Sequence, residues 1–227
     1  MVSARPAYTA AVFDMDGLLL DSERPIRDAW LHVAAGLGVE LSMADYLGVV
    51  GLNHVDSSAR MLALFGGDAA LLAQARQRTE ALLDDGPPFA AKPGAARLLQ
   101  TLRAARIPCG VASSTHHAQV RQRLTHAGLL DHFDTICGGD EVRRGKPDPD
   151  LYQLALQRLG ATADSTLAFE DSGHGVQAAI AAGLATVAVP DLKAPPPEWL
   201  ARCVAVLPSL EAACTHTTTW FGAICAD

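Results

Sequence analysis

The sequence predicts an α/β fold in which an all-helical unit is inserted into a core built around a parallel β-sheet. From residue 92 onward, short β-rich runs alternate with helical segments, which is typical of a parallel sheet covered by helices on both faces. Residues 18–90 instead carry apolar residues at helical spacing. A buried-strand run, Ala10–Phe13, precedes this helical region, so the core is expected to be discontinuous in sequence.

The first strand is followed directly by two acidic residues and a glycine. Asp14 and Asp16 are two residues apart, so their carboxylates can project to the same side where the strand ends, and Gly17 lets the chain turn away. Paired carboxylates at such a point suit a metal ion and a phosphate group. A buried strand followed by a solvated Asp-Gly turn explains the segment equally well. This stretch alone therefore leaves both interpretations open.

The helical unit is predicted from four segments separated by glycines. These segments are Pro25–Leu37, Ser42–Val49, His54–Phe65 and Asp68–Leu83. Gly86, Pro87 and Pro88 then end the helical pattern. We therefore predict a helical cap domain over residues 18–90 and a core made of residues 1–17 and 91–227. Two linkers, near 18–23 and 86–92, are candidate hinges between them.

The rest of the core follows as alternating helices and strands. The predicted elements are helix Ala95–Ala105, strand Pro108–Ala112, helix His117–Ala127, strand Phe133–Cys137, helix Pro149–Leu159, strand Thr166–Phe169, helix Gly175–Ala182 and strand Thr186–Val189. This alternation predicts a Rossmann-like, doubly wound parallel sheet, in which ligands bind at the carboxyl ends of the strands. The tail, residues 215–227, fits no element of this pattern and is interpreted as peripheral.

Three further polar clusters fall where predicted strands end. Ser113 and Ser114 precede a helix and could form an anion site, although helix capping is the simpler explanation. Lys146 lies in a proline-rich loop of a chain that has only three lysines, and its alternative is a solvated turn residue. Glu170 and Asp171 supply hard oxygen ligands that suit Mg²⁺, or alternatively a helix cap. With the Asp14 segment, four polar clusters lie at strand ends, and it is improbable that all four are only turns or helix caps.

Composition excludes several other classes of protein. The net charge of −7 and the absence of a basic stripe disfavour nucleic acid as a partner. No apolar run reaches the ~18 residues of a membrane span, and the N-terminus lacks a signal-peptide pattern, so we expect no membrane partner and a cytoplasmic location. The five cysteines form no Cys-x-x-Cys pair, and the histidines lack zinc-ligand spacing. A reduced, monomeric protein without zinc is expected.

The combination of clusters resembles the haloacid dehalogenase-like phosphohydrolase superfamily. Its four motifs match Asp14-Met15-Asp16-Gly17, Ser113, Lys146 and Glu170-Asp171 in order, and the resemblance spans roughly residues 8–212, including a helical cap after the first motif. The segments 14–23 and 145–149 look most similar to the subgroup that contains β-phosphoglucomutase and small sugar-phosphate phosphatases. The resemblance specifies the superfamily well and the substrate poorly.

The resemblance implies a role for each matching residue. Asp14 would be the nucleophile that forms an aspartyl-phosphate, and Asp16 the general acid and base. Mg²⁺ would be held by Asp14, the backbone carbonyl of Asp16 and Asp171, with Glu170 beside them. The phosphoryl oxygens would be held by Ser113, with Ser114 next to it, and by Lys146.

Departures from other branches of the superfamily narrow the activity. Dehalogenases lack the second aspartate, which is present here as Asp16, and phosphonoacetaldehyde hydrolases use a cap lysine, whereas residues 18–90 contain none. Mutases carry an arginine and a lysine where this chain has His54 and His116, which we interpret as substrate-specificity residues. We predict a Mg²⁺-dependent phosphatase for a small phosphate monoester, expected to be a sugar phosphate. A β-phosphoglucomutase-like hexose-phosphate mutase is the alternative, and a non-catalytic interaction protein is a third reading.

Overall fold

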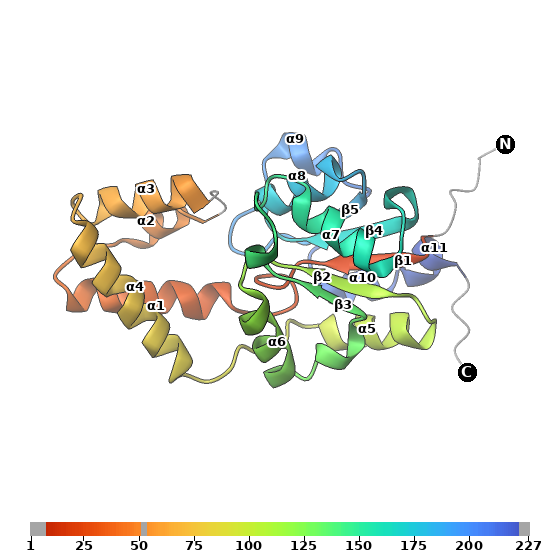
Figure 1. The fold of residues 1–227 in the computed structure, drawn as a ribbon, viewed down its shortest axis with the longest axis horizontal. Helices are drawn as coiled ribbons and strands as arrows, with labels where there is room; N and C mark the ends of the chain where they lie inside the picture. Colours follow the sequence, from red (N-terminus) through yellow and green to blue (C-terminus); the bar gives the residue numbers. More distant parts are fainter. Residues whose placement is uncertain (1–7, 51–53, 223–227) are drawn as a thin grey trace.

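The computed structural model describes residues 8–50 and 54–222, apart from the side chains of His54 and Val55. In these residues, six strands form one parallel sheet (Figure 1). The strands are β1 (Ala10–Phe13), β2 (Cys109–Ala112), β3 (Thr135–Cys137), β4 (Thr166–Glu170), β5 (Ala185–Ala188) and β6 (Ala205–Val206). Their order across the sheet is β3-β2-β1-β4-β5-β6, so β1 and β4 are central neighbours. The predicted α/β class with a doubly wound parallel sheet is confirmed.

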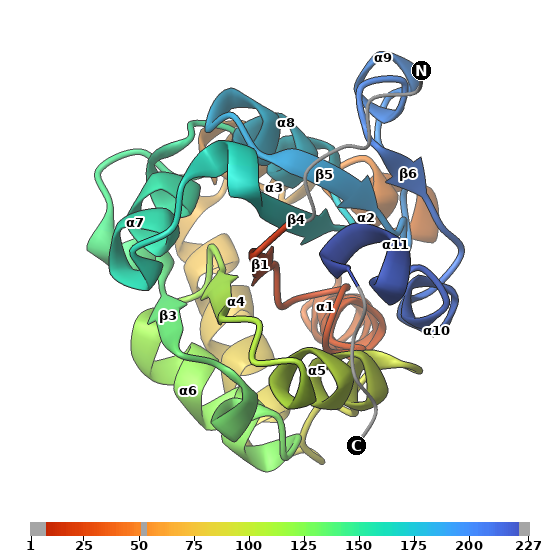
Figure 2. The same cartoon turned by 90° about the vertical axis from the view of Figure 1, so that its right-hand side faces the viewer.

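Helices cover both faces of the sheet, as Figure 2 shows with the strands between α5 and α6 on one side and α7 and α8 on the other. These helices are α5 (Ala95–Ala104), α6 (His117–His126), α7 (Asp150–Leu159) and α8 (Gly173–Ala181). Alternation along β1 explains the two layers, because Phe13 joins the cluster under α5 and Val12 joins the cluster under α7 and α8. Strands buried on both faces read as continuous apolar runs, which is the pattern of this sequence.

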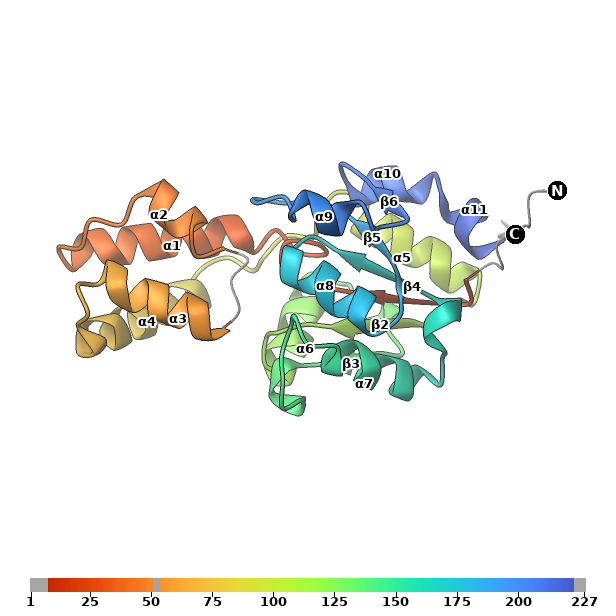
Figure 3. The same cartoon turned by 90° about the horizontal axis from the view of Figure 1, so that it is seen from above.

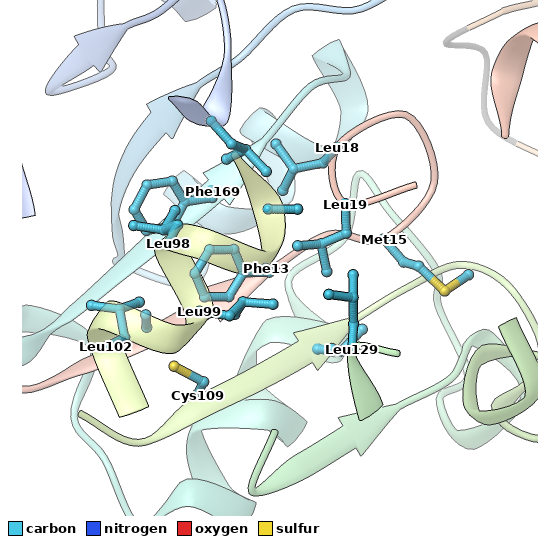
Figure 4. Close-up of a cluster of buried hydrophobic side chains, with 14 of the residues drawn as sticks. Phe13, Met15, Leu18, Leu19, Leu98, Leu99, Leu102, Cys109, Leu129 and Phe169 are labelled. Atoms are coloured by element: carbon cyan, nitrogen blue, oxygen red, sulfur yellow. The ribbon is translucent and has the colours of Figure 1, made fainter. Parts of the chain in front are cut away.

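The core below α5 is centred on two aromatic rings from the central strands (Figure 4). Phe13 of β1 and Phe169 of β4 stack with ring centroids 4.7 Å apart. Leu98, Leu99 and Leu102 of α5 are fully buried against them. Burying each such side chain contributes about 1.5–3 kcal/mol, so this packing fixes the two strands whose ends carry Asp14 and Glu170.

Two predicted strands begin later than expected, and one strand was missed. Pro108 has no backbone N–H to donate to the sheet, and β2 starts at Cys109. Residues 130–132 form a 3₁₀ turn, η1 (Leu130–His132), and β3 starts only at Thr135. The missed strand, β6, has two residues, which is too short to produce a periodic signal in the sequence.

The C-terminal segment corrects the interpretation that residues 215–227 are peripheral. Helix α11 (Thr217–Phe221) follows α10 (Leu210–Cys214) and α9 (Pro197–Leu200), and its Trp220 and Phe221 are buried in the main core. The Trp220 ring packs edge-on against Phe169, with centroids 5.7 Å apart. The backbone carbonyl of Trp220 accepts a 2.7 Å hydrogen bond from the N–H of Tyr8. Residues 223–227 lie outside the described part of the chain.

Trp220→Ala is therefore expected to lower the free energy of unfolding by about 3–5 kcal/mol, because it opens a large cavity beside β4. The matched control is Trp199→Ala, since Trp199 is only half-buried on α9 and stacks on Arg202. That control should cost no more than about 1 kcal/mol. Urea unfolding followed by circular dichroism measures both values, and equal losses in the two variants would restore the peripheral interpretation.

In its described residues the inserted region forms four helices beside the sheet (Figure 3). They are α1 (Glu23–Gly36), α2 (Met43–Leu47), α3 (His54–Leu64) and α4 (Ala69–Asp84), and a small apolar cluster joins α1, α3 and α4. The two linkers to this helical unit run side by side, since Asp21 N–H donates to Ala90 O and Lys92 N–H donates to Leu19 O. The carboxyl ends of the strands face this unit (Figure 1). In the part of the chain that the structure describes, no helix has the length and apolarity needed to cross a membrane.

Candidate active site

Asp14 is fixed at the edge of the sheet by the pairing of β1 with β4. Phe13 lies opposite Phe169, and the N–H of Asp14 donates to the carbonyl of Phe169 over 3.0 Å. This register places Asp14 next to Glu170 and Asp171, which end and follow β4. Gly17 is required by the same approach, because its φ is +84° and a Cβ there would collide with the carboxylate of Asp171.

A buried ion cluster results from this approach. Lys146 Nζ lies 2.5 Å from Asp14 Oδ1 and 2.5 Å from Glu170 Oε1, and its side chain is only 6% exposed. Asp14, Glu170 and Asp171 are also buried, with one oxygen of each within 4.8 Å of the others. Three carboxylates therefore face a single ammonium, which leaves an excess of negative charge in a region of low polarity.

Both carboxylate oxygens of Glu170 accept hydrogen bonds from neighbouring groups. Its Oε1 accepts from Lys146 and from the Tyr152 hydroxyl at 2.8 Å, and its Oε2 accepts from the backbone N–H groups of Asp171 and Ser172 and from the Ser172 hydroxyl. Gly175 of α8 packs directly on this carboxylate, where a Cβ would collide with it. This arrangement suits Glu170 to orienting Lys146. Tyr152 was not predicted, because it reads as one more apolar position of a helix.

The pKa values of the cluster reflect its burial. Burial raises the pKa of Asp14 well above its ordinary value, Lys146 opposes the shift, and Glu170 adds to it. Burial also raises the pKa of Asp171, and the charges of Asp14 and Glu170 raise it further. Burial would lower the pKa of Lys146, but the carboxylates of Asp14 and Glu170 outweigh it, and the net pKa is raised. The cluster therefore favours an additional positive charge.

A divalent cation fits the donor set of this cluster. The carboxylates of Asp14, Glu170 and Asp171 are hard oxygen ligands, and magnesium is bound in proteins by such oxygens. Their excess charge is what a bound cation would neutralise. The carboxylate of Asp16 is not part of this group of three, so the predicted role of its backbone carbonyl as a ligand stays a prediction.

Asp16 contacts a different set of partners, on α6 and the loop before it. Its Oδ1 lies 3.0 Å from Arg123 Nη1, and its Oδ2 accepts from the Thr115 hydroxyl at 2.8 Å. Arg123 in turn lies over the ring of Phe89, in the second linker, at 5.0 Å. Arg123 was not predicted, since it reaches Asp16 only through the fold. To protonate a leaving group, the carboxylate of Asp16 must first take up a proton, which weakens or breaks its ion pair with Arg123.

The predicted phosphate-binding residues lie along the same edge. Ser113 is buried at the end of β2, where its N–H donates to Cys137 O, and its hydroxyl accepts from Thr115 N–H. Ser114 follows it and is exposed. His116 is also exposed, and its Nδ1 lies 3.7 Å from Asp140 Oδ2. His54 begins α3, but its side chain lies outside the described residues, so its predicted specificity role is not placed.

A cavity of about 610 Å³ connects these groups, a size suited to a small ligand. Of the predicted site residues, those that line it are Asp14, Asp16, Ser113, Ser114, His116, Lys146 and Asp171, while Glu170 lies behind Lys146. The cavity also has lining residues that were not predicted. These are Glu23, Ser57, Gly139, Asp140, Val142, Arg143, Gly145, Ser172 and His174. Because Ser57 belongs to α3, the helical unit forms part of the cavity wall.

Among these additional residues, Glu23, the first residue of α1, has the most strongly shifted pKa. Burial raises the pKa of Glu23 to about 7, and the charges of Asp16 and Asp191 add to the shift. It therefore brings a group that titrates near neutrality to the wall contributed by the helical unit. Its position two residues after Asp21, in a linker that reads as a helix start, gave no sign of this role.

Comparison with known proteins identifies similar chains with the same overall organisation. A family model described as haloacid dehalogenase-like hydrolase matches residues 11–189. The fructose-1-phosphate phosphatase YqaB of Escherichia coli is 32% identical over 188 residues, which cover 80% of this chain and 96% of that protein.

Two solved structures are similar over most of the chain. A hydrolase of the same family from Deinococcus radiodurans, with bound phosphate and sodium, has a TM-score of 0.77 and 28% identity, covering 97% of this chain and 100% of that one. A putative β-phosphoglucomutase from Thermotoga maritima has a TM-score of 0.73 and 28% identity, covering 91% and 96%. The likeness thus extends over the sheet and the helical unit together.

Proposed function

The chain belongs to the haloacid dehalogenase-like hydrolase family, and we propose that it is a phosphatase that hydrolyses a small phosphate monoester through an aspartyl-phosphate on Asp14, with Mg²⁺ as cofactor. The observation that carries this proposal is the contact of Asp14 with Lys146 in a buried carboxylate cluster that opens into the 610 Å³ cavity. The similarity to a fructose-1-phosphate phosphatase supports a sugar phosphate as substrate.

Each residue of the site is assigned one task in this reaction. Asp14 attacks phosphorus and displaces the alcohol, and the resulting acyl phosphate is then attacked by water, so one difficult displacement is divided into two. Asp16 protonates the departing alkoxide and afterwards takes a proton from the water. Lys146 and the groups around Ser113 hold the phosphoryl oxygens, and Lys146 also offsets the charge of Asp14. Bound Mg²⁺, held by Asp14 and Asp171 beside Glu170, would neutralise charge on the phosphoryl oxygens.

The helical unit is proposed to act as a cap, in keeping with the predicted division into a cap of residues 18–90 and a core of residues 1–17 and 91–227. Its α3 already lines the cavity, and only the two paired linkers join it to the core. Closure of such a unit would exclude water from the phosphoryl group until the alcohol has left. We also propose that the protein is cytoplasmic and monomeric.

The experiment that tests the function is a screen for inorganic phosphate release with Mg²⁺. Sugar phosphates, nucleotides and glycolytic intermediates form the panel, and fructose 1-phosphate is the first candidate because of the E. coli relative. Release from at least one small ester is expected. A protein that releases phosphate from none of them, although it is folded and loaded with Mg²⁺, would contradict the proposal.

A mutase is the second candidate, because one similar structure is a putative β-phosphoglucomutase. A mutase must hold a bisphosphate intermediate by its distal phosphate while the intermediate reorients. His116 stands where a mutase lysine is expected, and an imidazole lacks the permanent charge of a lysine ammonium. Losing such charge-assisted hydrogen bonds costs about 1.5–3 kcal/mol each.

We therefore expect hexose monophosphates that are accepted to yield inorganic phosphate and free sugar in equal amounts. Net conversion of β-glucose 1-phosphate to glucose 6-phosphate is not expected. A coupled dehydrogenase assay for glucose 6-phosphate, run beside the phosphate assay, separates the two. Glucose 6-phosphate that forms faster than phosphate would favour the mutase.

A further inference from the structure

Arg143 is a cationic residue at the mouth of the active-site cavity that has no role in the mechanism above. It lies in the loop between η2 (Gly139–Glu141) and α7, three residues before Lys146. Its side chain is exposed and lines the cavity. Among the described residues it makes no ion pair or hydrogen bond, whereas Arg123 and Arg144 both pair with carboxylates.

The charge of the cavity makes this arginine significant. The lining residues include five carboxylates, those of Asp14, Asp16, Glu23, Asp140 and Asp171. Lys146 and Arg143 are the permanently charged cations among the described lining residues. The ammonium of Lys146 is committed to Asp14 and Glu170 at the buried end, whereas Arg143 remains available at the exposed end. An anionic substrate entering the cavity therefore meets an uncommitted guanidinium there.

The neighbouring arginine shows that this availability is specific to Arg143. Arg144 lies 3.3 Å from Asp148 and 2.8 Å from Asp150, and it is not among the residues that line the cavity. These ion pairs tie the loop to the start of α7. Two adjacent arginines thus have different environments, one engaged with carboxylates of its own loop and the other left at the cavity wall.

We propose that Arg143 binds a second anionic group of the substrate, a carboxylate or a second phosphate, at the end remote from the phosphate that is cleaved. A guanidinium presents a planar fork of donors that matches either group in a bidentate manner. Lys146 and Arg143 then grip the two ends of one molecule, one at the buried end of the cavity and one at its mouth. This inference rests on the proposed phosphatase function and specifies its substrate class.

The test compares matched pairs of esters. Glycerol 3-phosphate is paired with 3-phosphoglycerate, which carries a carboxylate, and fructose 1-phosphate is paired with fructose 1,6-bisphosphate. The measured quantity is the ratio of kcat/KM for the member that carries a second anionic group to kcat/KM for the member of the pair that lacks it. It is determined for the wild type, Arg143→Gln, Arg143→Lys and the control Arg144→Gln. The pair that shows the effect distinguishes a carboxylate from a phosphate.

Arg143→Gln is expected to lower this ratio about 10-fold in at least one pair, because a charge-assisted contact is lost. Arg143→Lys should recover part of it, and Arg144→Gln should keep the wild-type ratio. The inference is overturned, and the phosphatase function left intact, if the wild type prefers the member without the second anionic group in both pairs. A ratio that Arg143→Gln leaves unchanged, or that falls equally in the Arg143 and Arg144 variants, overturns it as well. A wild type that hydrolyses no ester at all overturns the proposed function itself.

Discussion

Asp14→Asn is expected to lower the rate of phosphate release by at least about 10⁴-fold, because the variant lacks the carboxylate that attacks phosphorus. The amide keeps the size of the side chain and can still accept a hydrogen bond from Lys146. Binding of the ester should therefore change less than kcat. Steady-state assays over a range of substrate concentrations separate the two effects.

The fold should survive this substitution. Burial raises the pKa of Asp14, which means that its charge is unfavourable in the metal-free cluster, so removing the charge should not lower the melting temperature. Asp131→Asn is the matched control, since Asp131 is exposed and remote from the cavity, and it should retain wild-type activity. Phosphate release at the wild-type rate by a folded Asp14→Asn protein would contradict a nucleophilic role for this residue.

Removing the divalent cation is expected to abolish turnover, and adding Mg²⁺ should restore it. Asp171→Asn removes one of the three clustered carboxylates and should lower kcat/KM at a fixed Mg²⁺ concentration by at least about 100-fold. Part of this loss should be recovered at higher Mg²⁺ if Asp171 is a ligand. Titrations of activity with Mg²⁺ for the wild type, Asp171→Asn and Asp131→Asn measure it.

The same titration should depend on pH in a defined direction. Because the pKa values of Asp14 and Asp171 are raised, protons compete with the cation as pH falls, and the Mg²⁺ concentration for half-maximal activity should rise. It should fall as pH increases and the carboxylates ionise. Full activity in EDTA, or a Mg²⁺ requirement that is unchanged in Asp171→Asn, would exclude the proposed cation site.

The fold was predictable because its signals are local. Four-residue apolar runs such as Ala10–Phe13 and Cys109–Ala112 alternate with amphipathic helices. A strand that is buried on both faces of a sheet needs such a continuous apolar run, so the runs indicate the strands directly. The C-terminal helix was not predictable, because Thr217–Phe221 has three threonines and no helical period, and only its contact with Phe169 reveals its place in the core.

The candidate site was predictable to the extent that its residues follow strand ends. Asp14, Ser113 and Asp171 are placed by the sheet register, which a parallel topology implies. Arg123 and Tyr152 could not be found in this way, since each reaches a site carboxylate from within a helix rather than from the end of a strand. Arg143 was missed for a different reason: it differs from Arg144 only in the side chains that surround it.

The most direct test of the account is to trap the phosphoenzyme during the first turnover. The Mg²⁺-loaded wild type is mixed with an accepted phosphate ester, quenched in acid within milliseconds, digested, and mapped by mass spectrometry. We predict a phosphorylated peptide that contains Asp14, which appears before free phosphate and is absent in Asp14→Asn. Phosphate release with no phosphorylated peptide at any time, or with the label on another residue, would contradict the mechanism.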